Sequence, residues 1–284
     1  MSTPTLALPT PTYARTVLGS GPGLLIAHGA GGGIAANYGP ILTGLAAAHT
    51  VVGVDLPGAG ETPRADAPLE LDHLADQLVA AGVAEGLDTF AVSGYSLGSA
   101  VAIRAATRHP ERVTALVLTA PFAHADHRLR LAARVWRGLY ESGDRATLAA
   151  YLTPLALGPA ALAALSPEEL AAVLRMTSQT PPPGTPEHTE LVERLDVRAD
   201  LTAIEVPALV VSTTGDRLVE PNHHRDVAAG LRDARVVELD TGHLPFAERP
   251  AEWQTAIVDF LDGIGAAEGI TGDRREASSR HTSG

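Results

Sequence analysis

The feature that most constrains this chain is the regular alternation of short apolar runs with longer stretches of helical pattern. The apolar runs lack the polar/apolar alternation of half-exposed strands, and this is typical of parallel strands that are covered on both faces. Strands that alternate with helices form a doubly wound, mostly parallel sheet. The sequence therefore predicts an α/β fold with strands at "GLLIAHG" 23–29, "TVVGVDLPG" 50–58, "TFAVSG" 89–94, "VTALVLTAP" 113–121, "ALVVSTTGD" 208–216 and "ARVVELD" 234–240.

Helical periodicity fills the intervals between these runs. Apolar residues recur on one face over 69–85, a helix is predicted over 96–109, and a final amphipathic helix is predicted over 248–262. From 122 to 200 the strand patterns stop, and an interruption of this length is too long for a loop, so we predict a small helical subdomain. The predicted organisation is a core of residues 1–121 and 201–264, the helical insertion 122–200, and a polar, disordered tail over 265–284.

Composition excludes several classes of function. The 284 residues contain no cysteine, which removes thiol nucleophiles, and all 21 basic residues are arginine, which removes a Schiff-base lysine. The net charge of −12 argues against a nucleic-acid partner, because such proteins need a basic face. The N-terminus lacks a signal-peptide pattern and no run of about 18 apolar residues occurs. We therefore expect a soluble, cytoplasmic protein with a small-molecule substrate and no membrane partner, and leave a homodimer open.

Three reactive residues fall at the carboxyl ends of three predicted strands, where ligands of parallel sheets bind. Ser96 lies in Gly94-x-Ser96-x-Gly98 between a strand and a helix, the context that a nucleophilic serine requires. Asp216 follows the strand over 208–213, and His243 follows the strand over 234–239. A serine in a tight turn without catalytic function is the simpler reading of Ser96 alone, and the strand-end positions of the other two residues argue against it.

With these residues the sequence resembles the α/β-hydrolase superfamily over about residues 13–264. The motifs that carry the resemblance are "GYSLG" 94–98, "HGAGG" 28–32, "DLPGAG" 55–60, "GDRLVEP" 215–221 and "GHLPFAERP" 242–250. The resemblance implies a helical cap at the 122–200 insertion and a Ser96–Asp216–His243 triad. It also implies an oxyanion hole made by the backbone N–H groups of Ala30 and Leu97.

The family resemblance also sharpens the expected pocket. Many relatives carry a bulky aromatic residue after the His-Gly pair, whereas this chain has Ala30 to Gly33, so we expect a flexible loop and a larger space near the oxyanion hole. A serine at the nucleophile position disfavours haloalkane dehalogenases and epoxide hydrolases, which use aspartate there. The residues expected to line the substrate site are Tyr95, His28, Phe122, His124, Trp136, Tyr140 and Leu244.

Two other carboxylates compete with Asp216 for the acid of the triad. Asp240 shares a short turn with His243 and would struggle to reach behind its ring, and Asp126 follows the preceding core strand, where some family members place the acid. The histidine pairs "HADH" 124–127 and "HH" 223–224 could suggest metal ligands, but no third ligand accompanies them in the sequence, so no metal and no cofactor is expected.

The expected function is that of a cofactor-independent serine hydrolase, a carboxylic ester hydrolase by type. Such an enzyme would cleave an ester, lactone or thioester through an acyl-enzyme on Ser96. A carbon–carbon bond hydrolase or lyase and a perhydrolase use the same triad. A receptor for a small lactone or hormone can also keep it, so these alternatives stay open.

Overall fold

The computed structural model describes residues 8–10 and 12–279, with side chains up to residue 264. A seven-stranded sheet with the order β1-β3-β2-β4-β5-β6-β7 forms its centre, and every pair is parallel except β1 with β3. The predicted doubly wound fold is confirmed. The strands are β1 Arg15–Leu18, β2 Gly23–Ala27, β3 Thr50–Val54, β4 Phe90–Tyr95, β5 Val113–Thr119, β6 Ala208–Thr213 and β7 Ala234–Leu239.

Strand β1 is the one strand that the sequence analysis missed. It has four residues, "RTVL", three of them exposed, so it carries no buried apolar run that could distinguish it from a loop. It lies at the edge of the sheet and pairs antiparallel with β3 from Arg15 opposite Val54 to Leu18 opposite Val51.

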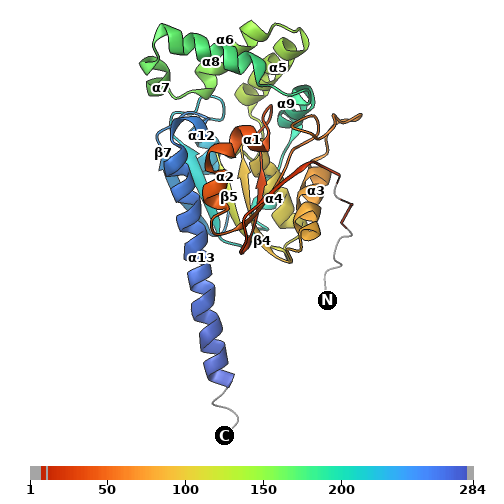
Figure 1. Cartoon of the computed structure of the whole chain (residues 1–284), viewed down its shortest axis with the longest axis vertical. Helices are drawn as coiled ribbons and strands as arrows, with labels where there is room; N and C mark the ends of the chain where they lie inside the picture. Colours follow the sequence, from red (N-terminus) through yellow and green to blue (C-terminus); the bar gives the residue numbers. More distant parts are fainter. Residues whose placement is uncertain (1–7, 11, 280–284) are drawn as a thin grey trace.

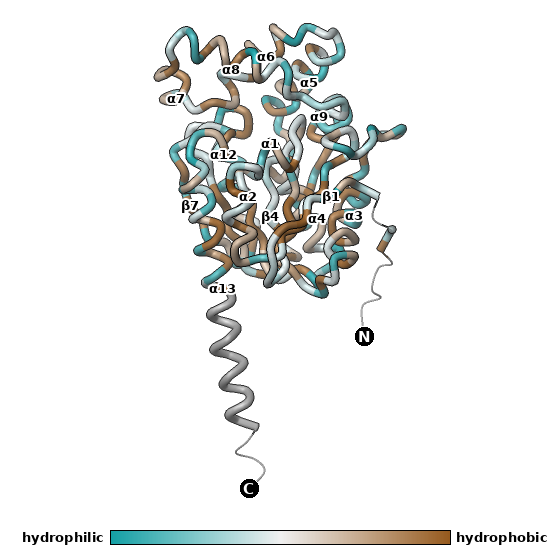
Figure 2. Tube along the Cα trace, viewed as in Figure 1, coloured by the Kyte–Doolittle hydropathy of each residue, from teal (hydrophilic) through white to brown (hydrophobic). Residues whose placement is uncertain are grey.

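Helices cover both faces of the sheet, which explains why the inner strands β2 to β6 are buried at nearly every residue. In β2, Leu25 contributes to the core under α3 (Leu71–Ala84), α4 (Leu97–Arg108) and α11 (Pro221–Gly230). Its neighbour Leu24 points to the opposite core, under α1 (Ile34–Asn37), α2 (Gly39–Leu45), α12 (Pro245–Glu248) and α13 (Pro250–Ser279). The most hydrophobic stretches of the chain gather in the strand layer between these helices (Figure 2).

Between β5 and β6 the chain forms helices and no strand of the sheet. We call residues 122–200 the cap segment; Figure 1 shows its helices α5 to α9 gathered beyond one end of the sheet. Their starts follow local capping chemistry, because Asp126, Asp144 and Ser166 each accept a backbone N–H from the first turn. The helices are α5 His127–Glu141, α6 Arg145–Ala156, α7 Pro159–Ala164, α8 Pro167–Gln179, α9 Thr185–Arg194 and α10 Arg198–Leu201.

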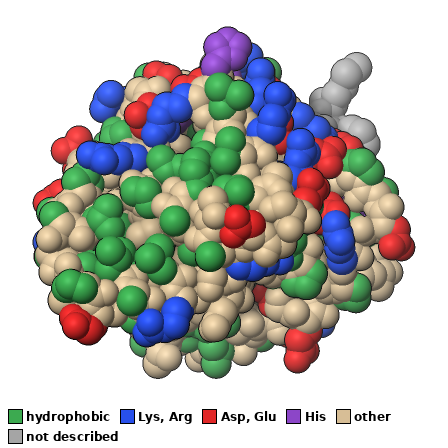
Figure 3. Space-filling model, turned by 90° about the horizontal axis from the view of Figure 1, so that it is seen from above, with side chains coloured by type: hydrophobic (Ala, Val, Ile, Leu, Met, Phe, Trp, Pro, Cys, Tyr) green, Lys and Arg blue, Asp and Glu red, His purple; other side chains and the backbone are tan. Residues whose placement is uncertain are grey.

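The outer face of the cap segment mixes exposed apolar side chains with arginines (Figure 3). The largest exposed apolar side chains on its helices are Leu131, Val135 and Met176. Among the described residues, no helix combines the length and the apolar character that crossing a membrane demands.

Helix α13 is longer than the sequence predicts. The prediction ended the helix at 262 and made 265–284 a disordered tail, whereas α13 continues to Ser279. The residues from 266 to 279 contain no proline, and alanine, glutamate and arginine favour a helix. The rest of the predicted tail, 280–284, lies outside the described residues.

Candidate active site

Ser96 occupies the turn between β4 and α4 in a backbone conformation that few residues other than glycine adopt. Its φ is 54° and its ψ −119°, and its N–H donates to Thr119 O on the neighbouring strand at 2.9 Å. The two glycines of the motif are explained by close approach. A Cβ at Gly94 would lie 2.2 Å from Gly98 O, and a Cβ at Gly98 would lie 2.1 Å from Ala27 O on β2. The strained turn therefore exists only because both positions lack a side chain.

Gly98→Ala is expected to destabilise the protein by more than about 3 kcal/mol or to prevent folding, because the methyl group would overlap a backbone atom that cannot move alone. The control is Gly138→Ala on α5, where an added Cβ meets nothing within 4 Å. Alanine in that helix should raise stability by about 0.5–1 kcal/mol. Urea unfolding of both variants checks the pair, and similar midpoints for the two would contradict the close approach at Gly98.

Ser96, His243 and Asp216 form one hydrogen-bonded chain across three strand ends. Ser96 Oγ lies 3.0 Å from His243 Nε2, and His243 Nδ1 lies 2.7 Å from Asp216 Oδ2. All three residues are buried, with 7% exposure for Ser96, 4% for His243 and 3% for Asp216. In this arrangement Nδ1–H donates to the carboxylate, so Nε2 is left to accept the proton of the serine hydroxyl.

Backbone and side-chain donors hold the Asp216 carboxyl group in the orientation that faces His243. Its Oδ1 accepts the N–H groups of Leu218 and Val219, both at 2.9 Å, and Oδ2 accepts the hydroxyl of Thr213 at 3.0 Å. Behind it, His224 Nε2 lies 4.0 Å from Oδ2, and burial lowers the pKa of this histidine to about 4. His224 is therefore a neutral, buried neighbour of the carboxylate at neutral pH.

The two competing carboxylates have other partners. Asp240 is exposed, so it does not lie behind the ring of His243. Asp126 caps α5 by accepting Leu129 N–H at 2.7 Å, and its other oxygen lies 3.3 Å from His223 Nε2. Of the three candidate acids, the structure brings Asp216 to His243.

The loop that carries His243 is held from three sides. Tyr95 donates its hydroxyl to His243 O at 2.8 Å, and the His243 N–H donates to Ala156 O, in the last residue of α6, at 2.7 Å. Glu248 accepts the N–H of Gly242 at 3.0 Å and that of Gly158 at 3.1 Å, and burial raises the pKa of its carboxyl. The cap segment thus helps to fix the position of His243 through two backbone groups, Ala156 O and the N–H of Gly158.

The loop after β2 faces Ser96 and is shaped by His28. The imidazole Nδ1 lies 2.8 Å from Gly29 O and Nε2 accepts the Leu56 N–H at 2.9 Å, while burial lowers the pKa of His28. With both ring nitrogens bonded to backbone, His28 supports the loop. It was predicted to bind substrate, and it is not among the residues that line the cavity beside Ser96. The two predicted oxyanion donors lie in this loop, at Ala30, and at the first residue of α4, Leu97, whose N–H has no acceptor within the helix.

A residue that the sequence analysis missed, His188 on α9, also holds this loop. Its Nδ1 accepts the Gly31 N–H at 3.2 Å, and its Nε2 lies 3.0 Å from Pro57 O, as expected for a neutral ring that donates from Nε2. Burial, followed by the neighbouring His28, lowers the pKa of His188 to about 3. The sequence signal was weak, because "TPEH" lies in a proline-rich turn without a motif.

Stability should fall in acid because His188 is buried in its neutral form. Its folded pKa of about 3 lies below the ordinary value of 6.5, so below pH 6.5 the unfolded chain binds a proton that the folded chain does not. Between pH 7 and 4.5 this linkage removes about 2–3 kcal/mol from the free energy of unfolding. His188→Gln, which keeps an acceptor and a donor but cannot titrate, should lose correspondingly less.

The measurement is urea unfolding at pH 7 and 4.5 for the parent and the variant. His127→Gln, at an exposed position on α5, is the control and should follow the parent. Parallel declines of the parent and His188→Gln would show that the buried ring does not cause the acid sensitivity.

A small cavity lies directly against Ser96, between the loop after β2 and the cap segment. Besides Ser96, its walls come from Ala30 in the loop after β2 and from Leu218 and Val219 after Asp216. The cap segment contributes the other residues of the lining, Phe122, Leu129, Ala133, Trp136, Thr189 and Val192. The volume of the cavity is about 20 Å³. The expectation of a larger space beside the glycine-rich loop is wrong, because the indole of Trp136 packs against Gly31: a Cβ there would lie 2.4 Å from Cζ2.

The same span of chain that builds this site matches a known family. A model of the α/β-hydrolase fold matches residues 22–250, which include the loop after β2, Ser96, Asp216 and His243. The chain belongs to the α/β-hydrolase fold family. It is thus an α/β-hydrolase enzyme, as its motifs predict.

Relatives of this α/β hydrolase include enzymes with different named reactions. The pyrrolizixenacetamide deacetylase of Xenorhabdus hominickii is 32% identical over 245 residues, 86% of this chain and 92% of the relative. A pimeloyl-[acyl-carrier protein] methyl ester esterase of Neisseria meningitidis is 31% identical over 230 residues, 78% of this chain and 86% of the relative. The crystal structure of the enol-lactonase from Burkholderia xenovorans has the same fold, with a TM-score of 0.75, 23% identity, and coverage of 88% of this chain and 96% of that one.

Of the other predicted substrate residues of the α/β hydrolase, two line the cavity and four do not. Phe122 and Trp136 do, whereas the ring of Tyr95 lies beneath His243 against Phe246 and Trp253. Tyr140 lies on the cap under the guanidinium of Arg145, with 3.5 Å from its ring centroid to Cζ. The backbone of His124 forms a bridge with Asp196, and Leu244 is the N-cap of α12. None of these four residues is among those that line the cavity.

The histidine pairs of the α/β hydrolase are used in packing and hydrogen bonding. His223 faces Asp126, and His224 Nδ1 lies 3.1 Å from Ser212 Oγ. Within the described part of the chain, no group of three or more His, Asp or Glu side chains has the arrangement of a metal site.

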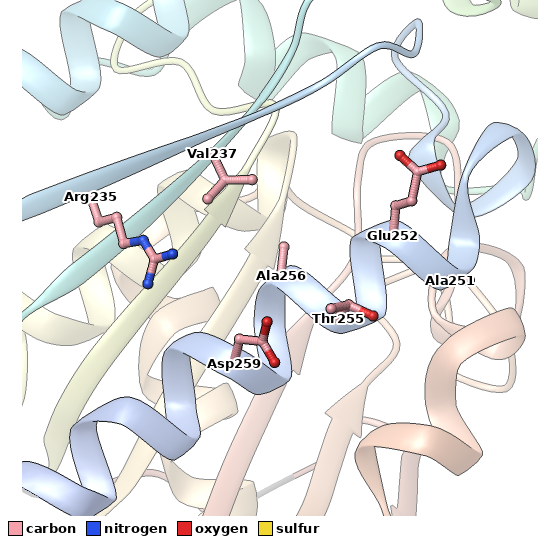
Figure 4. Close-up of a pocket in the computed structure, with 7 residues that line it drawn as sticks. All are labelled: Arg235, Val237, Ala251, Glu252, Thr255, Ala256 and Asp259. Carbon is pink, nitrogen blue, oxygen red and sulfur yellow. The ribbon is translucent and has the colours of Figure 1, made fainter.

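Two larger hollows of this α/β hydrolase lie away from Ser96. One, of about 370 Å³, lies between β7, which contributes Arg235 and Val237, and α13, which contributes Glu252 and Asp259 among others (Figure 4). Another, of about 440 Å³, is bordered by Tyr13, His73 and the loop from 57 to 70. Neither includes a residue of the Ser96–His243–Asp216 chain.

Proposed function

We propose that this α/β hydrolase is a serine hydrolase that cleaves a carboxylic ester of a small molecule through an acyl-enzyme on Ser96. The observation that carries the proposal is the continuous chain from Ser96 Oγ through His243 to Asp216, with 3.0 Å and 2.7 Å between the partners. Ser96, at one end of these hydrogen bonds, lies at an apolar cavity in which an acyl group can meet the nucleophile. Lactones and thioesters present the same electrophilic carbonyl and belong to the same proposal.

In the first half-reaction Ser96 Oγ attacks the carbonyl carbon, and His243 Nε2 takes the hydroxyl proton. The electron pair of the carbonyl bond moves to its oxygen, and the N–H groups of Ala30 and Leu97 are the proposed donors to that oxyanion. When the intermediate collapses, the bond to the leaving oxygen breaks and His243 gives its proton to the departing alcohol. The acyl group then remains on Ser96.

In the second half-reaction water attacks the acyl-enzyme, and His243 Nε2 takes one of its protons. Collapse of the second tetrahedral intermediate releases the carboxylic acid and returns the proton to Ser96 Oγ. In both halves Asp216 stabilises the charged imidazole, and the donors from Leu218, Val219 and Thr213 keep the carboxylate in place.

Amide hydrolysis is a second candidate function, and it rests on one observation. The Xenorhabdus relative, 32% identical over 86% of this chain, is named a deacetylase of an acetamide. An acetamide needs the same nucleophile and base, and His243 would protonate the leaving amine.

The proposal is tested with a fluorophosphonate and with turnover. The wild-type protein should be labelled at Ser96, found by mass spectrometry of the peptide that carries it, and should hydrolyse 4-nitrophenyl acetate and an aryl acetamide over many cycles. If the acetamide were hydrolysed faster than an acetate ester whose leaving group is equally reactive, the second candidate would be favoured. Labelling at another residue, or folded protein that is neither labelled nor active on any ester or amide, would count against both.

A further inference from the structure

The cavity beside Ser96 is small for a substrate pocket. Ligand pockets commonly measure about 300–1,000 Å³, whereas this one measures about 20 Å³. A site needs about 10–15 Å³ to hold one water molecule, so the cavity only slightly exceeds that minimum. Beyond the carbonyl group that reacts with Ser96, little more than a methyl or ethyl group fits.

One helix of the cap segment, α5, forms one wall of the cavity. Leu129, Ala133 and Trp136 are spaced by four and three residues on α5, so they share one face of the helix, and all three line the cavity. Leu129 and Ala133 are buried. The indole of Trp136 packs against the backbone at Gly31, which has no Cβ. The largest of these three side chains therefore lies next to the loop that carries Ala30.

The walls are also uncharged. Apart from Ser96, the one hydroxyl among them belongs to Thr189, whose Oγ1 donates to Thr185 O and Pro186 O, both at 2.9 Å. The other lining residues are alkyl or aromatic, and the lining includes no acidic or basic residue. A charged acyl group would lose its hydration here and meet no oppositely charged side chain, which costs far more than burying a methyl group gains.

We propose that this cavity is the acyl subsite, that it selects uncharged acyl groups of two or three carbons, and that Trp136 is the residue that sets this limit. The proposal rests on the serine hydrolase function proposed above and names its acyl class. The leaving group lies outside the cavity and is not restricted by it.

The test compares 4-nitrophenyl acetate, butyrate and octanoate on the full chain and on Trp136→Phe and Trp136→Ala. Wild type should show a kcat/KM for butyrate at least about 10-fold below that for acetate, and a lower value still for octanoate. Trp136→Ala should raise the octanoate-to-acetate ratio by about 10²-fold, and Trp136→Phe should fall between, because each step removes volume from the wall. Leu131→Ala, on the same helix with 59% of the side chain exposed, should keep the wild-type ratio.

Three outcomes separate the possible failures. Wild type that prefers octanoate would overturn the acyl subsite while leaving the serine hydrolase function intact. An unchanged ratio in both folded Trp136 variants would overturn the assignment of the limit to Trp136, and Trp136→Phe keeps this arm available if Trp136→Ala does not fold. Equal, background-level rates of wild type and Ser96→Ala on all three esters would overturn the serine hydrolase function itself, and the subsite with it.

Discussion

Ser96→Ala is expected to lower kcat by a factor on the order of 10⁶, because Ser96 carries the hydroxyl that pairs with His243 Nε2. The other hydroxyl in the cavity wall, of Thr189, donates to Thr185 O and Pro186 O. The fold should survive, since the hydroxyl contacts His243 alone and the backbone N–H to Thr119 O remains. The measurement is steady-state hydrolysis of the best ester from the acyl series, with thermal unfolding of both proteins in parallel.

A matched serine separates the nucleophile from the general effect of losing a hydroxyl. Ser142 is exposed at the end of α5, where its hydroxyl donates to Leu139 O, and Ser142→Ala should keep wild-type activity. If Ser96→Ala retained more than about one-hundredth of the wild-type kcat with an unchanged melting temperature, the acyl-enzyme on Ser96 would be wrong.

Asp216→Asn should produce the second largest loss, about 10⁴-fold in kcat, with little change in the fold. The Oδ1 position can still accept the N–H groups of Leu218 and Val219, so the asparagine amide nitrogen takes the Oδ2 position toward His243 Nδ1. That nitrogen donates and cannot accept, so the imidazole must carry its proton on Nε2. In that tautomer Nε2 cannot accept the proton of Ser96.

The competing carboxylates supply the controls for this variant. Asp240→Asn alters an exposed residue and should leave kcat unchanged. Asp126→Asn keeps a side-chain oxygen for the Leu129 N–H, so it too should remain active, with at most a small loss of stability. A large loss of kcat in either control, with activity preserved in Asp216→Asn, would move the acid of the triad to that residue.

Much of the site could be predicted from the sequence because its parts lie at strand ends. Buried parallel strands can be recognised in the sequence by their apolar runs. The residues that follow three of them, Ser96, Asp216 and His243, meet because the carboxyl ends of parallel strands lie at the same end of the sheet. The glycines at 94 and 98 could likewise be predicted as close approaches, which the clashes at their Cβ positions explain. The catalytic roles of these residues stay predictions until the variants above are measured.

The parts of the site that could not be predicted depend on contacts between segments that are distant in the sequence. Nothing in "TPEH" indicates that His188 bonds Gly31, 157 residues away, and nothing in the glycine-rich loop indicates that Trp136 fills the space beside it. For a related reason, the motif does not indicate where the ring of Tyr95 lies. Its neighbour in the motif is the nucleophile, but its ring turns to the opposite core, where its hydroxyl bonds His243 O.

The tethers between the cap segment and the core limit how this enzyme can be re-engineered. His188 bonds Gly31 in the loop after β2, and Ala156 O accepts the N–H of His243 in the loop before α12. A chimaera that receives the cap of a relative would therefore replace the cap residues that line the cavity and lose two supports of the loops beside Ser96. Cap exchange in this scaffold requires that the loop from Gly29 to Gly33 and the loop before α12 be transplanted as one unit with the helices above them.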